Sequence, residues 1–308
     1  MCGCPVTAGP LEEVLEAVPA FAGGVRAVTA LPGGLTNANH RVDTDDGSFV
    51  IRRWSDDTGL LAIDRRHEYE NSVRAAAAGV GAQVVDYLPE HNAMVFEFVD
   101  GRTMSAADLR RGDLLGKVAD ACRGLHGAER FSGDFDMFDV QRRYERIVAE
   151  RGFRLPERFE SFAPHVEAIR DAFVVREEAT VPCNNDLLAE NLILRGERFC
   201  LIDYEYAGNN DPCFELGNVW SESNLSRVQL DELVTAYYGR HLRHKVARAR
   251  LWGLMSKYGW TLWASIQDGV SDIDFDFWAW GMEKYDRAVE EFDSPEFERL
   301  LDEAQRAD

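Results

Sequence analysis

Asp186 and Asn191 lie five residues apart in the segment Asn-Asp-Leu-Leu-Ala-Glu-Asn. In this spacing the Asp can accept the proton of a substrate hydroxyl group while the Asn binds Mg²⁺. Asp203 follows a short apolar run that predicts a strand, and Glu205 adds a second acid two residues later. Asp and Asn also occur together in exposed turns, which is the simplest alternative. The spacing, the strand and the second acid together instead predict phosphoryl transfer at a metal ion, a reaction that depends on positioning and charge neutralisation.

A pair of glycines, Gly33 and Gly34, separates two runs with strand-like composition. Glycine turns let backbone N–H groups approach the phosphates of a nucleotide. Thr36 and Asn37 add side-chain donors next to this turn. The same glycine pair would also suit an ordinary hairpin turn. We therefore expect a phosphate-binding role for this turn if the other predicted site residues lie beside it.

The third strand-like run carries a cation suited to such a site. Arg52 follows Ile51 there, and Glu68 lies on a predicted helix from which its carboxylate could orient the guanidinium. An Arg side chain stays charged and can bind phosphate through two parallel hydrogen bonds. Arg53 is the alternative, since neighbouring strand residues face opposite ways and only one can point into a cleft. The alternation favours Arg52, because it lies opposite the apolar Ile51.

Aromatic residues gather between residues 252 and 280, where five of the seven tryptophans fall. Trp260, Trp263 and Gln267 recur at helical spacing and share one helix face. Phe277 and Trp280 form a second aromatic pair. Aromatic faces beside acids suit a quaternary ammonium group, which cannot donate hydrogen bonds. Aromatic helix faces more commonly pack into a core, which is the competing interpretation.

The composition limits the classes of partner. The chain has 308 residues, with 34 Lys and Arg against 54 Asp and Glu, and a net charge of −20. This balance disfavours nucleic acids and acidic membranes and suits a cationic ligand, although an acidic surface also keeps a protein soluble. No apolar run approaches the roughly 20 residues of a membrane span, and the start lacks the basic segment of a signal peptide, so we expect a cytoplasmic protein. Six scattered cysteines indicate reduced thiols, and Cys2 and Cys4 lack a second pair with zinc-like spacing.

Hydrophobic periodicity predicts an α+β protein with two unequal lobes, at residues 1–99 and 100–308. Strands are expected at 25–31, 38–44, 48–54, 83–88 and 93–99, with a short leading helix at 11–18 and another helix at 63–78. In the second lobe, helices are expected at 105–110, 112–127, 138–152, 157–176, 212–223, 227–240, 244–267, 274–292 and 295–306. The only strand-like stretch expected there is 192–203, which leads into Asp203.

Four segments together resemble the choline and ethanolamine kinase family, within the larger group of aminoglycoside phosphotransferases and protein-kinase-like enzymes. They are Gly33-Gly-Leu-Thr-Asn with Phe49-Val-Ile-Arg52; Ile63-Asp-Arg65 with Glu68 and Asn71; Asn185-Asp-Leu-Leu-Ala-Glu-Asn191 with Ile202-Asp-Tyr-Glu-Tyr-Ala-Gly208; and Tyr258 to Gln267 with Phe275 to Trp280. The resemblance covers most of the chain. It implies a two-lobed protein-kinase-like fold, with a small N-terminal lobe built on a five-stranded antiparallel sheet and a larger, mostly helical C-terminal lobe.

The resemblance also implies a role for each matching residue. Asp186 would be the catalytic base, with Asn191 and Asp203 as magnesium ligands, Glu205 as a further acid of the metal site, and Arg52 and Glu68 as the phosphate-orienting pair. The backbone around Phe96 and Phe98 would be the hinge that meets adenine. One position departs from the family, which usually has His two residues before the base, where this chain has Asn184. An Asn amide can both donate and accept hydrogen bonds, so the loop can keep its support.

By resemblance, then, the chain is an ATP- and Mg²⁺-dependent kinase for the hydroxyl group of a small cationic amino alcohol, with choline expected first. Trp260, Trp263 and Trp280 match aromatic positions that hold the ammonium group, and Glu222 is a candidate acid beside them. Ethanolamine, another amino alcohol or an aminoglycoside are the alternative acceptors. A catalytically impaired, ligand-binding pseudokinase is a further alternative, suggested by Asn184. We expect a monomer or a homodimer, since parts of the family form dimers.

Overall fold

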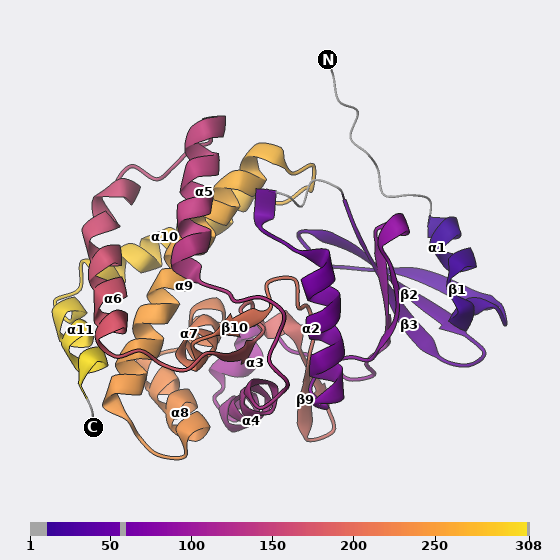
Figure 1. Cartoon of the computed structure of the whole chain (residues 1–308), viewed down its shortest axis with the longest axis horizontal. Helices are drawn as coiled ribbons and strands as arrows, with labels where there is room; N and C mark the ends of the chain where they lie inside the picture. Colours follow the sequence, from indigo (N-terminus) through magenta and orange to yellow (C-terminus); the bar gives the residue numbers. More distant parts are fainter. Residues whose placement is uncertain (1–10, 56–59, 307–308) are drawn as a thin grey trace.

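The computed structural model describes residues 11–55 and 60–306, which form a small N-terminal lobe and a larger C-terminal lobe (Figure 1). The N-terminal lobe contains a five-stranded antiparallel sheet in the order β1-β2-β3-β5-β4. Its strands are β1 Val25–Leu31, β2 Asn37–Thr44, β3 Ser48–Trp54, β4 Val84–Leu88 and β5 Ala93–Glu97. These strands agree closely with the expected ones. Cys2 and Cys4 lie outside the described residues.

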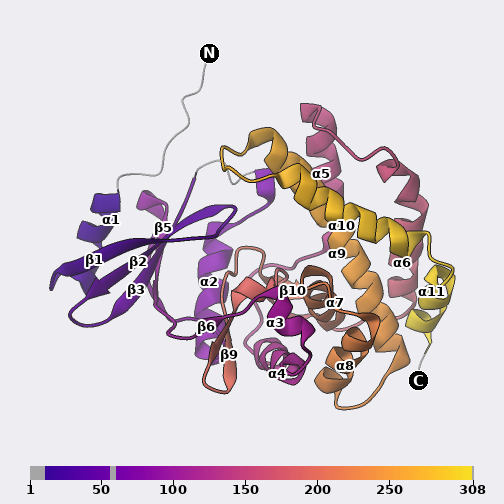
Figure 2. The same ribbon diagram turned by 180° about the vertical axis from the view of Figure 1, so that it is seen from behind.

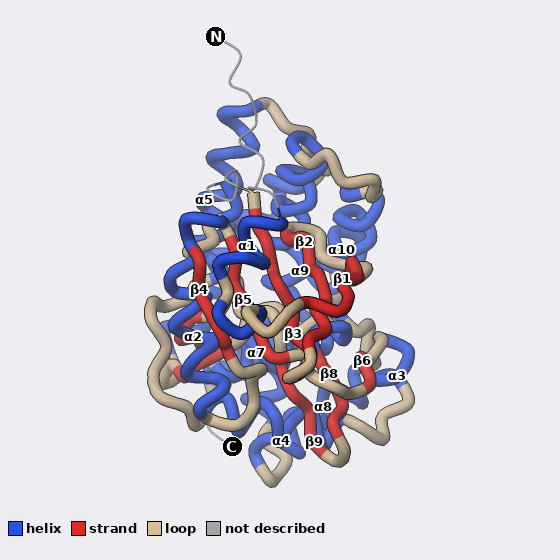
Figure 3. Tube along the Cα trace, turned by 90° about the vertical axis from the view of Figure 1, so that its right-hand side faces the viewer, coloured by secondary structure: helices blue, strands red, loops and turns tan. Residues whose placement is uncertain are grey.

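The sheet separates a small apolar core from the side that faces the C-terminal lobe. Helix α1, Leu11–Ala17, packs on the outer face (Figure 3), where Val14, Ile51 and Val95 belong to one buried cluster. Because side chains alternate along a strand, Arg52 points to the opposite face from Ile51. The apolar pattern of β3 thus places a cation on the face toward the C-terminal lobe.

Helix α2, Arg65–Ala77, lies between β3 and β4 in the chain and contacts the C-terminal lobe. It begins after Asp64, whose side chain accepts hydrogen bonds from two backbone N–H groups of the first turn. Its buried face is polar and includes Glu68 and Asn71. The Asn71 side chain donates hydrogen bonds to the backbone oxygens of Ala207, at 2.9 Å, and Ser132, at 3.3 Å. These bonds tie α2 to the segment that follows Asp203.

A 28-residue helix, α9, runs through the C-terminal lobe, and α5, α7, α10 and α11 pack on it (Figures 1 and 2). A Cβ atom added to Gly217 of α7 would lie only 2.1 Å from the backbone oxygen of Ala249. Glycine at this position therefore lets α7 and α9 approach closely. The helices of this lobe are α3 Ala106–Arg110, α4 Leu115–His126, α5 Met137–Arg151, α6 Ala163–Val175, α7 Pro212–Glu222, α8 Arg227–Tyr238, α9 Arg243–Val270, α10 Phe277–Phe292 and α11 Phe297–Gln305. None of the described helices is both long and apolar enough to cross a membrane.

The C-terminal lobe holds more strands than expected. β8 Leu192–Arg195 and β9 Arg198–Leu201 form the expected hairpin, joined at its edge by β6 Arg102–Thr103. A second small sheet pairs β7 Val181–Cys183 with β10 Gly208–Asn210. The prediction of a single strand-like stretch was therefore wrong, because two- and three-residue strands are too short to show a hydrophobic period. The pair β7 and β10 brackets the segment that carries Asp186 and Asp203.

Several helix boundaries also differ from the sequence-based expectation by a few residues, and two of these differences have a visible local cause. The helix expected at 157–176 is a 3₁₀ turn, Phe159–Phe162, followed by α6, which carries Pro164 in its first turn. The helix expected at 274–292 begins only at Phe277, after Asp276, whose side chain accepts a hydrogen bond from the backbone N–H of Ala279 at 2.8 Å.

Candidate active site

A cavity of about 840 Å³ lies between the two lobes, and most of the predicted site residues line it. Those that do so are Gly33, Gly34, Thr36, Arg52, Phe96, Phe98, Asp186, Asn191, Asp203, Glu205, Glu222, Trp260, Trp263 and Trp280. Four predicted residues lie outside this lining: Asn37, Glu68, Gln267 and Phe277. Each of the four contacts a residue or segment at the cavity wall, as described below.

A buried acid, Glu215, fixes the loop that carries Asp186 through hydrogen bonds to its backbone. Both carboxylate oxygens of Glu215 accept hydrogen bonds at 2.8 Å, one from the backbone N–H of Asn184 and one from that of Asn185. Asn185 has a positive φ of 67°, a conformation that Asn tolerates better than most residues. The side-chain nitrogen of Asn191 donates to the backbone oxygen of Asp186 at 2.8 Å. The two ends of the Asp-x-x-x-x-Asn segment are therefore fixed relative to each other.

Asn184 supports the loop through its side-chain amide, which both donates and accepts hydrogen bonds. Its nitrogen donates to the backbone oxygen of Asp203 at 2.7 Å, and its oxygen accepts from the backbone N–H of Asp186 at 3.1 Å. Asp203 itself has a positive φ of 66° directly after the strand β9 and Ile202. The amide thus bridges the two segments that present carboxylates to the cavity.

The charged end of the cavity consists of Arg52, Arg65, Glu68, Asp203 and Glu205. Arg52 donates to Glu68 at 2.8 Å and to Asp203 at 2.6 Å, and its side chain is only 8% exposed. Arg65 donates to the other oxygen of Glu68 at 2.6 Å and lies 3.4 Å from Glu205. Two guanidinium groups therefore connect three buried or half-buried carboxylates.

Two residues of the glycine turn also reach this end. The Thr36 hydroxyl donates to Glu205 at 2.9 Å, and the Asn37 amide donates to the same carboxylate at 2.8 Å. Gly33 and Gly34 adopt φ values of 90° and 93°, which only glycine adopts readily. The glycine turn is therefore not an isolated hairpin tip, because its side chains contact the acids of the site.

Burial and neighbouring carboxylates shift the pKa values of two acids in the cavity. Burial raises the pKa of Asp186 well above its usual range, and the carboxylates of Glu222 and Asp203 raise it further. Burial, with the nearby Asp203 carboxylate, raises the pKa of Glu205 to about 7. Both acids would release a proton more readily once a cation binds near them. Strongly perturbed acids in a cleft are typical of catalytic sites.

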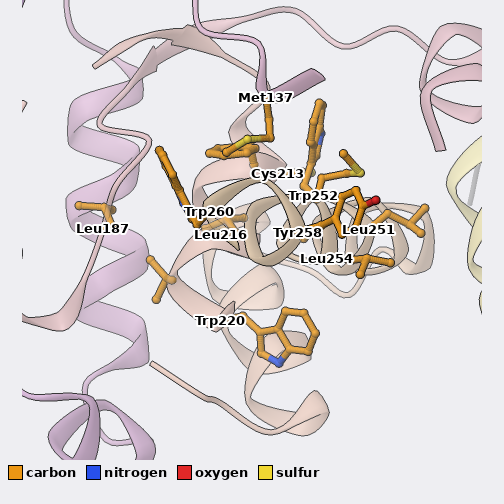
Figure 4. Packing of buried hydrophobic residues seen from close by; sticks show 14 of the residues in the cluster. Met137, Leu187, Cys213, Leu216, Trp220, Leu251, Trp252, Leu254, Tyr258 and Trp260 are labelled. Atoms are coloured by element: carbon orange, nitrogen blue, oxygen red, sulfur yellow. The ribbon is translucent and has the colours of Figure 1, made fainter. Parts of the chain in front are cut away.

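The aromatic end of the cavity consists of Trp260, Trp263, Trp280, Glu222 and Lys284. Trp263 and Trp280 meet edge to face with ring centroids 5.4 Å apart. The Glu222 carboxylate pairs with the Lys284 ammonium at 2.5 Å, and that ammonium lies 4.1 Å from the centre of the Trp280 ring. Figure 4 shows Trp260 pointing from α9 to the side where Leu187 lies, whereas Trp252 and Tyr258 point away from it. The tryptophans of α9 are thus divided between the cavity and the core.

Two of the predicted acceptor residues lie behind this wall. Phe277 is buried and packs on Trp263 with ring centroids 5.8 Å apart, while Phe275 lines the cavity. Gln267 donates from its side-chain nitrogen to the backbone oxygen of Leu35 at 3.2 Å. Gln267 therefore joins the end of α9 to the glycine turn of the other lobe.

A sequence profile of the phosphotransferase enzyme family matches residues 27–252. The chain belongs to this family. Ethanolamine kinase 2 of Mus musculus is 27% identical over 259 residues, covering 74% of this chain and 66% of that protein. The solved structure of a choline/ethanolamine kinase family protein from Mesorhizobium loti aligns with a TM-score of 0.84 and 28% identity over 96% of this chain and 98% of that one. Choline kinase LicA from Streptococcus pneumoniae aligns with a TM-score of 0.77 and 22% identity over 91% and 97%.

These similarities confirm the predicted two-lobed kinase-like fold and the predicted enzyme class, a phosphotransferase that acts on an alcohol group. In this phosphotransferase, the donor set at the charged end fits a magnesium ion. Asp203 and Glu205 supply carboxylate oxygens, and Asn191 can supply an amide oxygen because its nitrogen is engaged with Asp186. Mg²⁺ prefers such hard oxygen ligands.

Sequence reasoning gave no role to three residues of the candidate site: Arg65, Glu215 and Lys284. The i,i+3 spacing of Arg65 and Glu68 could have indicated the first. Glu215 lies 30 residues after Asn185, and Lys284 lies 62 residues after Glu222, so no local pattern joins either pair. Only the folded chain brings these partners together.

Proposed function

We propose that the protein is an ATP-dependent kinase that transfers the γ-phosphoryl group to the hydroxyl group of choline. The observation that carries this proposal is the continuity of one cavity, which is lined by Asp186 and the acids of the charged end and also by Trp260, Trp263 and Trp280. A small amino alcohol could place its hydroxyl group at Asp186 and its ammonium group against the tryptophans. The names of the relatives, among them choline and ethanolamine kinases, support the same acceptor class.

At the hydroxyl end, Asp186 aligns the acceptor and takes its proton as the phosphoryl group is transferred. Thr36, Asn37 and the glycine turn lie beside the acids, where the phosphates of ATP would bind, and Arg52 supplies a fixed positive charge. Asn191, Asp203 and Glu205 would hold magnesium, which when bound neutralises charge on the phosphates. Phe96 and Phe98 lie on the cavity wall of the N-terminal lobe, where adenine would meet the hinge.

The aromatic end favours choline because a trimethylammonium group binds through cation–π attraction rather than hydrogen bonds. Trp260 and Trp263 are almost fully buried, and Trp280 meets Trp263 at an angle of 60°. Faces at such an angle can surround a bulky cation.

Ethanolamine is the second candidate acceptor, and one observation favours it. The Oε1 atom of Glu222 is buried and has no hydrogen-bond partner among the described residues, although the side chain lines the cavity. A primary ammonium group could donate a hydrogen bond to this oxygen, whereas a trimethylammonium group could not. An unsatisfied buried acceptor costs free energy, so a donor there would be favoured.

An acceptor panel tests the proposal. Purified protein with ATP and Mg²⁺ would be offered choline, ethanolamine and its mono- and dimethyl derivatives, and an aminoglycoside, with ADP release and phosphorylated product both measured. We expect the highest kcat/KM for choline. A higher kcat/KM for ethanolamine would identify ethanolamine, not choline, as the acceptor. A preference for the aminoglycoside would contradict the amino-alcohol assignment. Nucleotide binding with no phosphorylated product from any acceptor would indicate a pseudokinase.

A further inference from the structure

The aromatic end contains a cation of its own, the ammonium group of Lys284. It binds the Oε2 atom of Glu222 at 2.5 Å and lies over the Trp280 ring at 4.1 Å. The Glu222 side chain is 2% exposed and that of Lys284 is 7% exposed, so water screens this pair poorly. Glu222 lines the cavity, whereas Lys284 does not, which means that the lysine lies behind the acid as seen from the acceptor.

The ion pair leaves Glu222 with no net negative charge of its own. Lys284 balances the charge of Glu222, and the Asp186 carboxylate lies close enough to interact with both groups. Arg287 adds another positive group nearby, since it donates to the backbone oxygen of Ser221 at 3.0 Å. This local balance contrasts with the net charge of −20 for the whole chain.

We propose that Lys284 is a specificity-determining residue that cancels the charge of Glu222, so that the site recognises the acceptor by its aromatic faces and one free carboxylate oxygen. This inference rests on the proposed function, because it concerns the acceptor of that reaction. An acceptor with one positive charge is held by the ring faces, while the paired Glu222 offers no net negative charge to a second cationic group of the acceptor. The pair therefore restricts the enzyme to small monocationic alcohols.

Two residue changes alter this balance in opposite directions. Lys284→Met keeps the length of the side chain and removes its charge, which leaves Glu222 as an uncompensated anion that attracts the acceptor cation. Glu222→Gln keeps the shape of the acid and leaves the Lys284 ammonium unpaired, which repels the acceptor cation. The double variant is uncharged at both positions and should resemble the wild type in its response to charge.

The experiment compares choline with 3,3-dimethylbutanol, its uncharged isostere in which carbon replaces nitrogen. The readout is the ratio of kcat/KM for the two alcohols, measured at about pH 8.5 so that a Glu carboxyl group is ionised. We expect this ratio to rise about tenfold or more in Lys284→Met and to fall about tenfold or more in Glu222→Gln. The reason is that two charges a few ångströms apart in a partly buried site interact by more than the free energy of a tenfold change. The double variant and Lys284→Arg should stay close to the wild-type ratio.

Lys117→Met is a matched control, because Lys117 pairs with Glu197 at the surface, away from the cavity. If Lys284→Met does not fold, Glu222→Gln still tests the charge balance, because it should change the kcat/KM ratio in the opposite direction. Ratios that stay at the wild-type value in both single variants would overturn the inference while leaving the kinase assignment intact. A wild-type enzyme that phosphorylates neither choline nor ethanolamine would instead overturn the proposed function. If ethanolamine proves to be the acceptor, ethanolamine and propanol provide the same comparison.

Discussion

The two ends of the cavity balance their charges differently. At the charged end, Arg52 and Arg65 are shared by three carboxylates, so one negative charge remains uncompensated when all three are ionised. The raised pKa of Glu205, about 7, reflects that excess together with burial. At the aromatic end, Glu222 and Lys284 form a neutral pair. The charged end thus favours a further cation, as a metal site does, whereas the aromatic end offers ring faces and one carboxylate oxygen without a partner among the described residues.

The largest expected effect is at Asp186, which lies between the two ends. Asp186→Asn should lower kcat about 10³-fold, because an amide cannot accept the hydroxyl proton. The backbone of the loop should stay in place, since Glu215 and Asn184 hold it through backbone groups. Steady-state kinetics with nucleotide-binding measurements would check this. Asp120→Asn, at an exposed position of α4 outside the cavity lining, is the matched control, and near-normal turnover by Asp186→Asn would contradict its role as the base.

Arg52 tests the charged end alone. Arg52→Met should lower kcat/KM for ATP about 10²-fold, as expected for the loss of one fixed donor to the transferred group. Arg52→Lys should lose less, because an ammonium group keeps the charge but cannot donate in the same forked geometry. KM for choline should change little in either variant. A larger change for choline than for ATP would show that the two ends are not independent.

Trp260 tests the aromatic end alone, with a smaller expected effect. Its indole nitrogen has no hydrogen-bond partner among the described residues, so Trp260→Leu removes mainly the ring face. We expect KM for choline to rise about tenfold, the usual size of a buried cation–π contact, with KM for ATP unchanged. Trp278→Leu is the control, since Trp278 stacks on Arg154 at 4.1 Å and does not line the cavity. Equal effects of the two substitutions would point to packing rather than acceptor binding.

The sequence predicted the parts of the fold and site that depend on local patterns. Alternation along β3 placed Arg52 on the cavity face and Ile51 in the core, and helical spacing placed Trp260 and Trp263 together. The strands β7 and β10 were missed because three residues show no period. Among the aromatic residues, periodicity could not distinguish the cavity wall from the layer behind it, so it included the buried Phe277.

Apart from the pair of Arg52 and Glu68, the partners of the charged groups could not be predicted, because they meet only through the tertiary fold. Arg65 lies 140 residues from Glu205, and a single sequence carries no signal for such a contact. The same holds for the pairing of Glu222 with Lys284. The candidate catalytic residues were thus easier to predict than the residues that pair with them.

The smallest expected effect concerns the stability contributed by two buried lysines near the aromatic end, Lys257 and Lys284. The Lys257 ammonium lies 3.4 Å from the centre of the Trp220 ring, and burial lowers its pKa well below the usual range, with Arg287 lowering it further. Between that lowered pKa and the ordinary value, the unfolded chain binds more protons than the native protein. The free energy of unfolding should therefore rise with pH across this window.

Lys257→Met should remove that pH dependence and raise the free energy of unfolding at neutral pH by roughly 1 kcal/mol, because an apolar side chain is not penalised for burial. Lys284→Met should have the opposite sign, since it leaves the Glu222 carboxylate buried without its cation, at a cost of about 3 kcal/mol. Denaturant unfolding at several pH values would measure both. If the two substitutions shifted stability in the same direction, a lysine bound to a carboxylate could not be distinguished from one that lies on an aromatic ring, and the charge balance inferred for the aromatic end would fail.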